Sequence, residues 1–148
     1  MTFALTSSAF TEGGPIPLEH TCDGKDVAPP LAWSGAPAGV ETFALIADDP
    51  DAPGGVWVHW VLFNLPGTAV ALPESKPEAE QGRNDFKRIG YGGPCPPPGR
   101  PHRYVFKLYA LHGRLPLRAG ATKADVERAM QGHVLGTAQL IGIYARRR

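Results

Sequence analysis

The stretch VWVHWVLFNL, residues 56–65, has the pattern of a β-strand and decides the fold class. Successive side chains of a strand point to opposite faces, so odd and even positions separate here. One predicted face carries Trp57, His59, Val61 and Phe63, and the other carries Val56, Val58, Trp60 and Leu62. Because both faces are apolar, we predict a central strand of a sheet.

Three more stretches predict strands, because they are short apolar runs bounded by turn residues. They are residues 42–47 (TFALIA), 103–111 (RYVFKLYAL) and 137–144 (TAQLIGIY). The acidic turn Asp48-Asp49-Pro50-Asp51 is expected to end the first of them. In the second, alternation places Tyr104 on the same face as the preceding His102.

One helix is predicted, at about residues 123–132. Thr122 and Asp125 have the spacing of a capping box, with Asp in place of the usual Glu. The 18 glycines and 16 prolines, 34 of 148 residues, indicate a chain rich in turns. These patterns predict an all-β protein of two antiparallel sheets rather than βαβ units, folded as a single domain over residues 1–148.

Composition excludes several classes of function. A formal net charge of +1 lacks the basic excess that binding to a phosphate backbone uses, so we expect no nucleic-acid partner. The start of the chain has no signal-peptide pattern and no apolar run spans a membrane, so we expect a cytoplasmic protein without a transmembrane segment. The spacing of Cys22 and Cys95 suits neither a CxxC motif nor a zinc site, and composition favours two buried free thiols.

Two histidines are candidates for a binding site. His59 and His102 lie in apolar strand stretches, where an imidazole without a partner is costly to bury. The alternative for each is a core histidine that is satisfied by hydrogen bonds. The acidic segment 48–53 follows a predicted strand, and its carboxylates suit either the capping of backbone N–H groups or the orientation of a histidine.

The segment 90–102 (GYGGPCPPPGRPH) favours a binding rim. Its glycines permit positive φ and close approach of a ligand, and its prolines stiffen the backbone. A stiff rim loses little entropy when a ligand binds. No phosphate-binding loop of the nucleotide type is present, since the chain contains neither GxxxxGK[ST] nor GxGxxG before a helix.

Two long motifs carry a family resemblance. DDPDAPGGVWVHWVLFNLP (48–66) and GRNDFKRIGYGGPCPPPGRPHRYVFKLYAL (82–111) closely resemble the signature regions of the phosphatidylethanolamine-binding protein family, which includes the Raf kinase inhibitor proteins. The flanking residues 11–37 and 123–146 resemble its short bacterial and archaeal branch. The resemblance implies two antiparallel sheets with Greek-key connections, one or two short helices, and a small anion-binding pocket at one edge.

The resemblance also implies which residues form that pocket. It would use Asp49, His59, His102 and Tyr104, surrounded by Ala52, Pro53, Trp57, Gly93 and Pro94. Val58 stands where many eukaryotic members have another histidine, and their additional C-terminal helix is missing, so their partner specificity does not transfer. Bacterial relatives indicate a homodimer. The motifs place Cys22 and Cys95 near the pocket rim, where a disulfide is the alternative to free thiols.

The expected ligand is a small anion, such as phosphate or a phosphorylated head group. His102 and Tyr104 offer N–H and O–H donors, and Asp49 is expected to orient a histidine rather than meet the ligand. We expect no cofactor, no metal and no enzymatic activity. Three alternatives remain: a thiol-dependent hydrolase using Cys95, His102 and Asp49, a metal site of Asp49, His59 and His102, and inhibition of a kinase or protease by protein contact.

Overall fold

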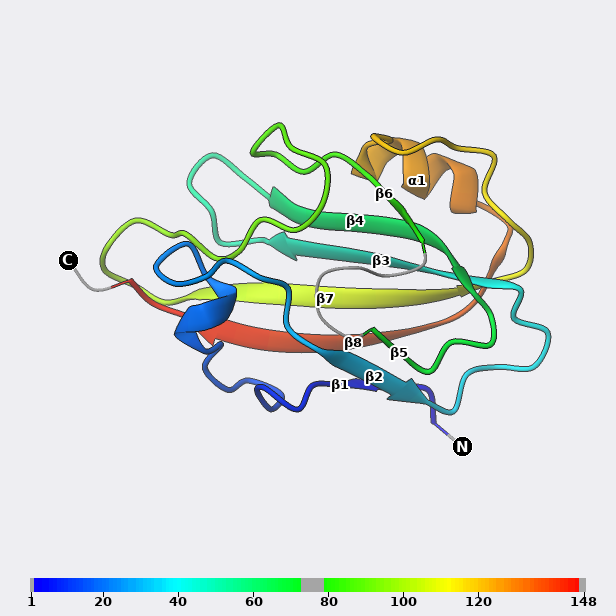
Figure 1. Cartoon of the computed structure of the whole chain (residues 1–148), viewed down its shortest axis with the longest axis horizontal. Coiled ribbons are helices and arrows are strands. Elements are labelled where there is room, and N and C mark those ends of the chain that lie inside the picture. The colour runs from blue at the N-terminus through cyan, green and yellow to red at the C-terminus, as the bar shows by residue number, and fades with distance from the viewer. Residues whose placement is uncertain (1, 73–78, 147–148) are drawn as a thin grey trace.

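Within residues 2–72 and 79–146, which the computed structural model describes, eight strands form two antiparallel sheets (Figure 1). The three-stranded sheet has the order β1 (Ala4–Thr6), β2 (Leu31–Ser34) and β5 (Ala71–Leu72). The five-stranded sheet has the order β6 (Glu80–Gln81), β4 (Trp57–Pro66), β3 (Thr42–Asp49), β7 (His102–Leu111) and β8 (Val134–Tyr144). The chain crosses repeatedly between the sheets, and the predicted all-β architecture is confirmed.

The short helices agree with the sequence pattern. Helix α1 spans Lys123–Met130, and the 3-10 helix η1 spans Leu18–His20. The Thr122 side chain accepts a hydrogen bond from the Asp125 N–H, and the Asp125 carboxylate accepts one from the Thr122 N–H. The predicted capping box therefore forms, and it satisfies two backbone donors that a helix start leaves without partners.

The five-stranded sheet buries both of its faces. On its inner face, Phe43, Leu45 and Leu62 pack in one core with residues of the three-stranded sheet such as Leu5 and Trp33. On its outer face, a second core joins sheet residues to α1; it contains Ala44, Val61, Phe63, Val126 and Met130. Figure 1 shows α1 beside the β4 side of this sheet, with β1 and β2 near β8. Two apolar faces explain why residues 56–65 lack an amphipathic pattern.

Strict alternation along residues 56–65 is wrong, because β4 contains a bulge. Ala47 pairs with Trp60 and the next residue, Asp48, pairs with Val58, which leaves His59 as an extra residue. Trp60 and Leu62 therefore lie in the inner core, whereas Val61 and Phe63 lie in the outer core with Val58. A bulge redirects the side chains that follow it, so His59 shares its face with Trp60 rather than with Val61.

The end of the strand predicted at residues 42–47 also differs from the prediction. Asp48 and Asp49 are the last residues of β3 and pair with Val58 and Trp57, so the turn begins after them. Strand β4 lies between β3 and β6, although β6 pairs with only Leu62 and Phe63. Strands β3 and β7 each lie between two long partners. Asp49 is therefore the last residue of a strand that has long partners on both sides.

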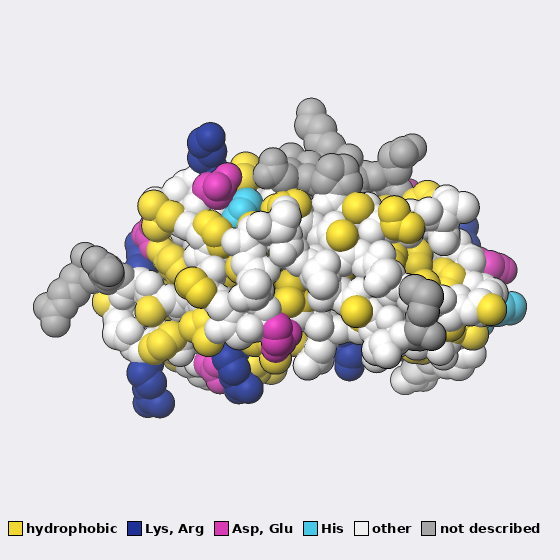
Figure 2. Space-filling view, turned by 90° about the horizontal axis from the view of Figure 1, so that it is seen from below, with side chains coloured by type: hydrophobic (Ala, Val, Ile, Leu, Met, Phe, Trp, Pro, Cys, Tyr) yellow, Lys and Arg dark blue, Asp and Glu magenta, His cyan; other side chains and the backbone are white. Residues whose placement is uncertain are grey.

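Figure 2 shows one face of the molecule. On the face shown in Figure 2, hydrophobic side chains are scattered among backbone and small polar groups, and the Lys and Arg side chains that are described lie mostly near the outline. Among the described residues, no helix is long and apolar enough to cross a membrane.

Candidate functional site

A cavity of about 240 Å³ opens at the end of the five-stranded sheet, where β3 ends and β7 begins. Its lining comes from the 49–59 segment, the 95–97 segment, Phe86 and the start of β7. The residues are Asp49, Ala52, Pro53, Trp57, His59, Phe86, Cys95, Pro96, Pro97, His102 and Tyr104. Seven of the nine residues that the sequence assigned to a pocket, Ala52 included, thus lie together.

Asp49 and His102 form a buried pair across the floor of this cavity. The Asp49 Oδ2 and His102 Nδ1 atoms are 2.6 Å apart, and the two side chains are 4% and 10% exposed. The other carboxylate oxygen, Oδ1, accepts the Asp51 N–H at 2.7 Å. Since a carboxylate accepts from the Nδ1–H, Asp49 fixes the tautomer and ring orientation of His102.

His59 is fixed in a different way, by a backbone carbonyl. Its Nδ1 donates to the Gly92 oxygen at 2.7 Å, and the Gly92 N–H donates back to the His59 oxygen at 2.9 Å. Burial lowers the pKa of His59 below its ordinary value of 6.5, although the Gly92 carbonyl and Asp49 oppose that shift. At neutral pH the ring is therefore uncharged, with Nε2 as an acceptor.

The Tyr104 hydroxyl is the unusual group of the cavity. Tyr104 is 2% exposed, and among the described residues its oxygen is the buried side-chain polar atom that has no hydrogen-bond partner. The ring lies edge-on to His59 and is stacked near His102. Burial and the negative charge of Asp49 raise the pKa of Tyr104, so the hydroxyl remains a donor.

Aromatic and proline side chains form the remaining wall. Trp57, 39% exposed, lies edge-on to Phe86, and Phe86 lies edge-on to His59. The sequence interpretation did not include Phe86, which lies in the loop before the rim. Its place depends on the buried Asn84 side chain, which accepts the Phe86 N–H and donates to the Gly90 oxygen. An asparagine that folds a loop onto itself is the signal that could have indicated it.

Gly93 and Pro94, which the resemblance placed around the pocket, lie behind its lining. The Gly93 N–H donates to Asp26 Oδ1, and the Pro94 carbonyl accepts the Cys22 N–H. A Cβ at residue 93 would collide with Asp26 and with the backbone of His20, so this close approach needs glycine. These two residues connect the rim to the 20–26 loop, and the lining itself comes from the next three residues.

Cys22 and Cys95 form a disulfide, with Cα atoms 5.4 Å apart. The expectation of two free thiols is therefore wrong, because the folded chain brings the 20–26 loop against the rim. The bond also removes the thiol that a hydrolase based on Cys95 and His102 would need, so this alternative is not supported. The same covalent link holds Cys95 in the cavity wall.

A metal site at the pocket is not supported by the geometry. Among the residues that the structure describes, no group of three His, Cys, Asp or Glu side chains is arranged to hold a metal ion. Asp49 already accepts hydrogen bonds at both oxygens, from the Asp51 N–H and from His102.

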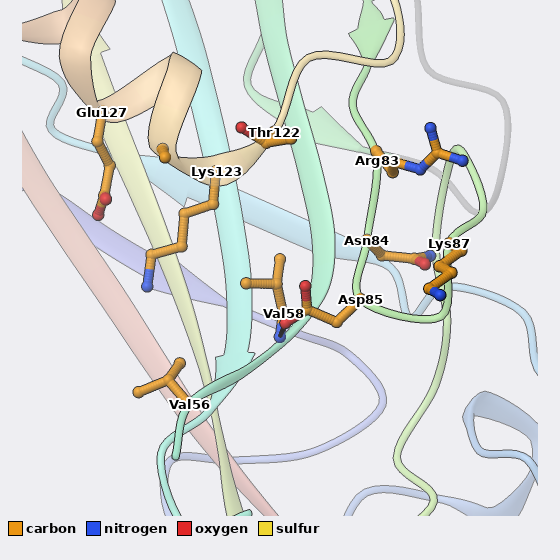
Figure 3. Close-up of a pocket in the computed structure, with 10 residues that line it drawn as sticks. Val56, Val58, Arg83, Asn84, Asp85, Lys87, Thr122, Lys123 and Glu127 are labelled. Atoms are coloured by element: carbon orange, nitrogen blue, oxygen red, sulfur yellow. Dashed lines mark hydrogen bonds between the residues drawn. The ribbon is translucent and has the colours of Figure 1, made fainter. Parts of the chain in front are cut away.

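A larger cavity, of about 650 Å³, lies on the outer face between α1 and the 83–87 loop (Figure 3). Val58 and Asp85 lie across from Thr122 and Lys123. Two of its charged groups have protein partners: Asp85 accepts the Val58 N–H at 2.7 Å, and Lys123 pairs with Asp48 at 2.8 Å. The others, Arg83, Lys87 and Glu127, are exposed to solvent. The smaller cavity, with its unpartnered hydroxyl, is therefore the better candidate site.

Comparisons with known proteins agree with the motifs. The family model described as phosphatidylethanolamine-binding protein matches residues 6–145. A UPF0098 protein of Methanothermobacter thermautotrophicus is 52% identical, covering 96% of this chain and 98% of the relative. A similar protein of Aquifex aeolicus is 47% identical, covering 95% and 86%.

Solved structures give the same result. A putative phosphatidylethanolamine-binding protein homologue of Chlamydia trachomatis, CT736, is 40% identical and superposes with a TM-score of 0.93 over 98% of each chain. YbcL of E. coli, described as a new member of the mammalian phosphatidylethanolamine-binding protein family, is 35% identical to this chain. Its TM-score is 0.93, and the match covers 99% of this chain and 100% of YbcL.

Proposed function

Because the chain belongs to the phosphatidylethanolamine-binding protein family, we propose that it binds a small anion, a phosphate or a phosphorylated head group, in the cavity lined by Asp49, His59, His102 and Tyr104. The family relationship supports a binding protein in general terms. The chemistry of the lining residues supports this class of ligand and this cavity.

The observation that carries the proposal is the Tyr104 hydroxyl, which is buried and has no partner. A buried polar group without a hydrogen bond is costly, so such groups in native proteins call for a water, an ion or a ligand. The two histidines also direct free atoms at the cavity: both use Nδ1 on protein acceptors, which leaves Nε2 available. A tetrahedral oxyanion has enough oxygens to meet all three groups.

The donors and acceptors of the lining residues indicate which protonation state of phosphate the proposed site binds. His102, when it carries both ring protons, donates from Nε2 while Asp49 balances its charge, and Tyr104 adds a second donor. The neutral His59 instead presents an acceptor, which suits the P–OH of a singly protonated phosphate. The proposed site therefore prefers a phosphate monoanion to the dianion at neutral pH.

The shape of the cavity favours a phosphate that carries a small organic group. Asp49, His59, His102 and Tyr104 are buried, whereas the apolar lining residues Trp57 and Pro97 are exposed and Phe86 is half-buried, so the apolar wall lies toward the solvent. A wall of this kind covers the carbon part of a ligand while the floor fixes its charged end.

Calorimetric titration with inorganic phosphate and phosphorylethanolamine, between pH 5.5 and 8.5, tests the proposal. Removing a hydrogen bond to a charged group weakens binding by about 1.5–3 kcal/mol, or about 10- to 100-fold, so His102→Ala and Asp49→Ala should each show this loss. His112→Ala is the matched control, since His112 is exposed and distant from the cavity. His20 is unsuitable as a control because it is buried and bonds Val27.

Affinity is expected to fall as pH rises, because the phosphate monoanion, whose P–OH suits the neutral His59, is converted to the dianion. Equal affinity in wild type and His102→Ala, or affinity that rises with pH, would place the ligand elsewhere. His102→Gln, which keeps a side-chain donor and the volume of the site, checks that a loss in the alanine variant does not come from collapse of the cavity.

A further inference from the structure

The pairing between β3 and β7 ends just before the proposed site. The last ladder pair joins Asp48 to Val105, and beyond it Asp49 pairs only with Trp57 of β4, while His102 pairs with Tyr144 of β8. The carboxylate and the imidazole of the buried pair therefore belong to strands that no longer hold each other at this point. Something other than the ladder must set the distance between them.

A second pair, Asp51 and Arg103, crosses the same gap. The Asp51 Oδ2 atom accepts the Arg103 N–H at 2.9 Å and the Nε–H at 3.0 Å, and Oδ1 accepts from Nη2 at 2.9 Å. Three donors from one residue hold a single carboxylate in a two-pronged geometry. The fixed shape of the guanidinium gives such a pair a defined distance and angle, which a lysine does not provide.

The two pairs form a closed ring of contacts. Arg103 is the chain neighbour of His102, His102 donates to Asp49, and Asp49 accepts the backbone N–H of Asp51, whose side chain returns to Arg103. We propose that Asp51 and Arg103 are positioning residues, which fix the distance and angle of the Asp49–His102 pair from outside the cavity. This inference rests on the proposed function for its importance to binding, but its geometry does not depend on a ligand.

The charge state of the Asp51–Arg103 pair supports this role. The hydrogen bonds from Arg103 lower the pKa of Asp51 from 3.8 to about 2, so the carboxylate stays ionised over the working range of pH. The Arg103 side chain is 56% exposed and does not line the cavity. The Asp51–Arg103 pair therefore does not contact the ligand. It provides a constant connection between the end of β3 and the start of β7.

Proton NMR of the full chain provides a readout that needs no ligand. The Nδ1–H of His102 donates to a carboxylate and that of His59 to a carbonyl, so both are expected as slowly exchanging, downfield signals. His102→Gln and His59→Gln assign them, since each removes one signal. In Arg103→Lys and Asp51→Asn, the His102 signal should broaden through faster exchange with water, and the His59 signal should stay sharp.

A matched control and a second variant separate positioning from other effects. Arg128→Lys alters another exposed Arg–Asp pair, with Asp125 on α1, and should change neither signal. Phosphate affinity should fall about 3- to 10-fold in Arg103→Lys, the range for one ordinary hydrogen bond, with a melting temperature close to that of Arg128→Lys. An unchanged His102 signal in Arg103→Lys and Asp51→Asn would overturn the proposal.

A purely electrostatic role of Arg103 would also overturn it, and the lysine variant detects this. If Arg103→Lys behaved as wild type and only Arg103→Ala were altered, the charge rather than the geometry would be responsible. If wild type bound no phosphate while the His102 signal still broadened in Arg103→Lys and Asp51→Asn, the proposed function would fail and the positioning role would stand.

Discussion

The two cavities at the Trp57 end of the five-stranded sheet lie on opposite faces, and they differ in whether they contain buried polar groups without a hydrogen-bond partner. The larger, outer cavity is bordered by charges that either have a protein partner, such as Lys123 with Asp48, or are exposed to solvent, such as Arg83 and Glu127. The smaller, inner cavity contains two imidazoles with a free nitrogen and the unpartnered Tyr104 hydroxyl. Unsatisfied buried polarity, rather than volume, therefore identifies the candidate site.

The largest expected difference between the two cavities concerns their covalent support. The wall of the inner cavity includes Cys95, bonded to Cys22, and removing a native disulfide typically costs about 2–5 kcal/mol. The variant Cys22→Ser/Cys95→Ser should lose stability in that range, measured by urea unfolding without reductant. Wild type in dithiothreitol should match it. A variant as stable as oxidised wild type would mean that the rim is held without the bond.

The pH dependence of stability should report the buried His59. Its folded-state pKa lies below the unfolded value of 6.5, so the unfolded chain binds more protons once pH falls below that value. Stability should therefore fall as pH decreases from 6.5, by at most about 1.4 kcal/mol per pH unit from this residue. His59→Gln should lose that part of the slope in urea unfolding between pH 5 and 8. The same slope in both proteins would contradict the assignment.

At the outer cavity, the start of α1 should affect stability but not binding. Thr122→Ala removes one half of the capping box and should lower the free energy of unfolding by about 1 kcal/mol. Phosphate affinity should stay within experimental error of wild type, because the helix start lies on the opposite face from Tyr104. A clear loss of phosphate affinity in this variant would break the separation of the two cavities.

The smallest effect is expected for the ion pair of the outer cavity. Lys123 and Asp48 are partly exposed, and such pairs contribute about 0–1 kcal/mol. Lys123→Ala should therefore change urea unfolding very little and phosphate binding not at all. If phosphate affinity dropped as far in Lys123→Ala as in His102→Ala, the outer cavity would become the candidate site.

Local patterns predicted much of the fold. Runs such as 103–111 and the spacing of Thr122 and Asp125 depend on neighbours in the chain, and the structure places a strand and a capped helix there. The site residues His102 and Tyr104 were placed on one face for the same reason. The strands of the three-stranded sheet were not predicted individually, since β1, β2 and β5 have only three, four and two residues.

The features that local patterns missed all depend on distant parts of the chain. The bulge at His59 exists because the β4 edge bonds the 82–92 loop: Val58 exchanges hydrogen bonds with Asp85, and His59 with Gly92. The polar composition of residues 73–88 is typical of a surface excursion. Residues 73–78 lie outside the described part of the chain, and residues 79–88 contain the buried Asn84. Pairing of Cys22 with Cys95 likewise requires two loops that only the fold brings together.

Tyr104→Phe tests the central claim most directly, because it removes only the unpartnered oxygen and leaves the ring in place. Replacing a buried hydroxyl that has no partner should leave the free energy of unfolding unchanged or slightly higher. Phosphate affinity in the same protein should fall about 10-fold or more, as expected when a donor to a charged ligand is lost. Lower stability together with unchanged phosphate affinity would mean that the hydroxyl serves the fold, and would contradict the account.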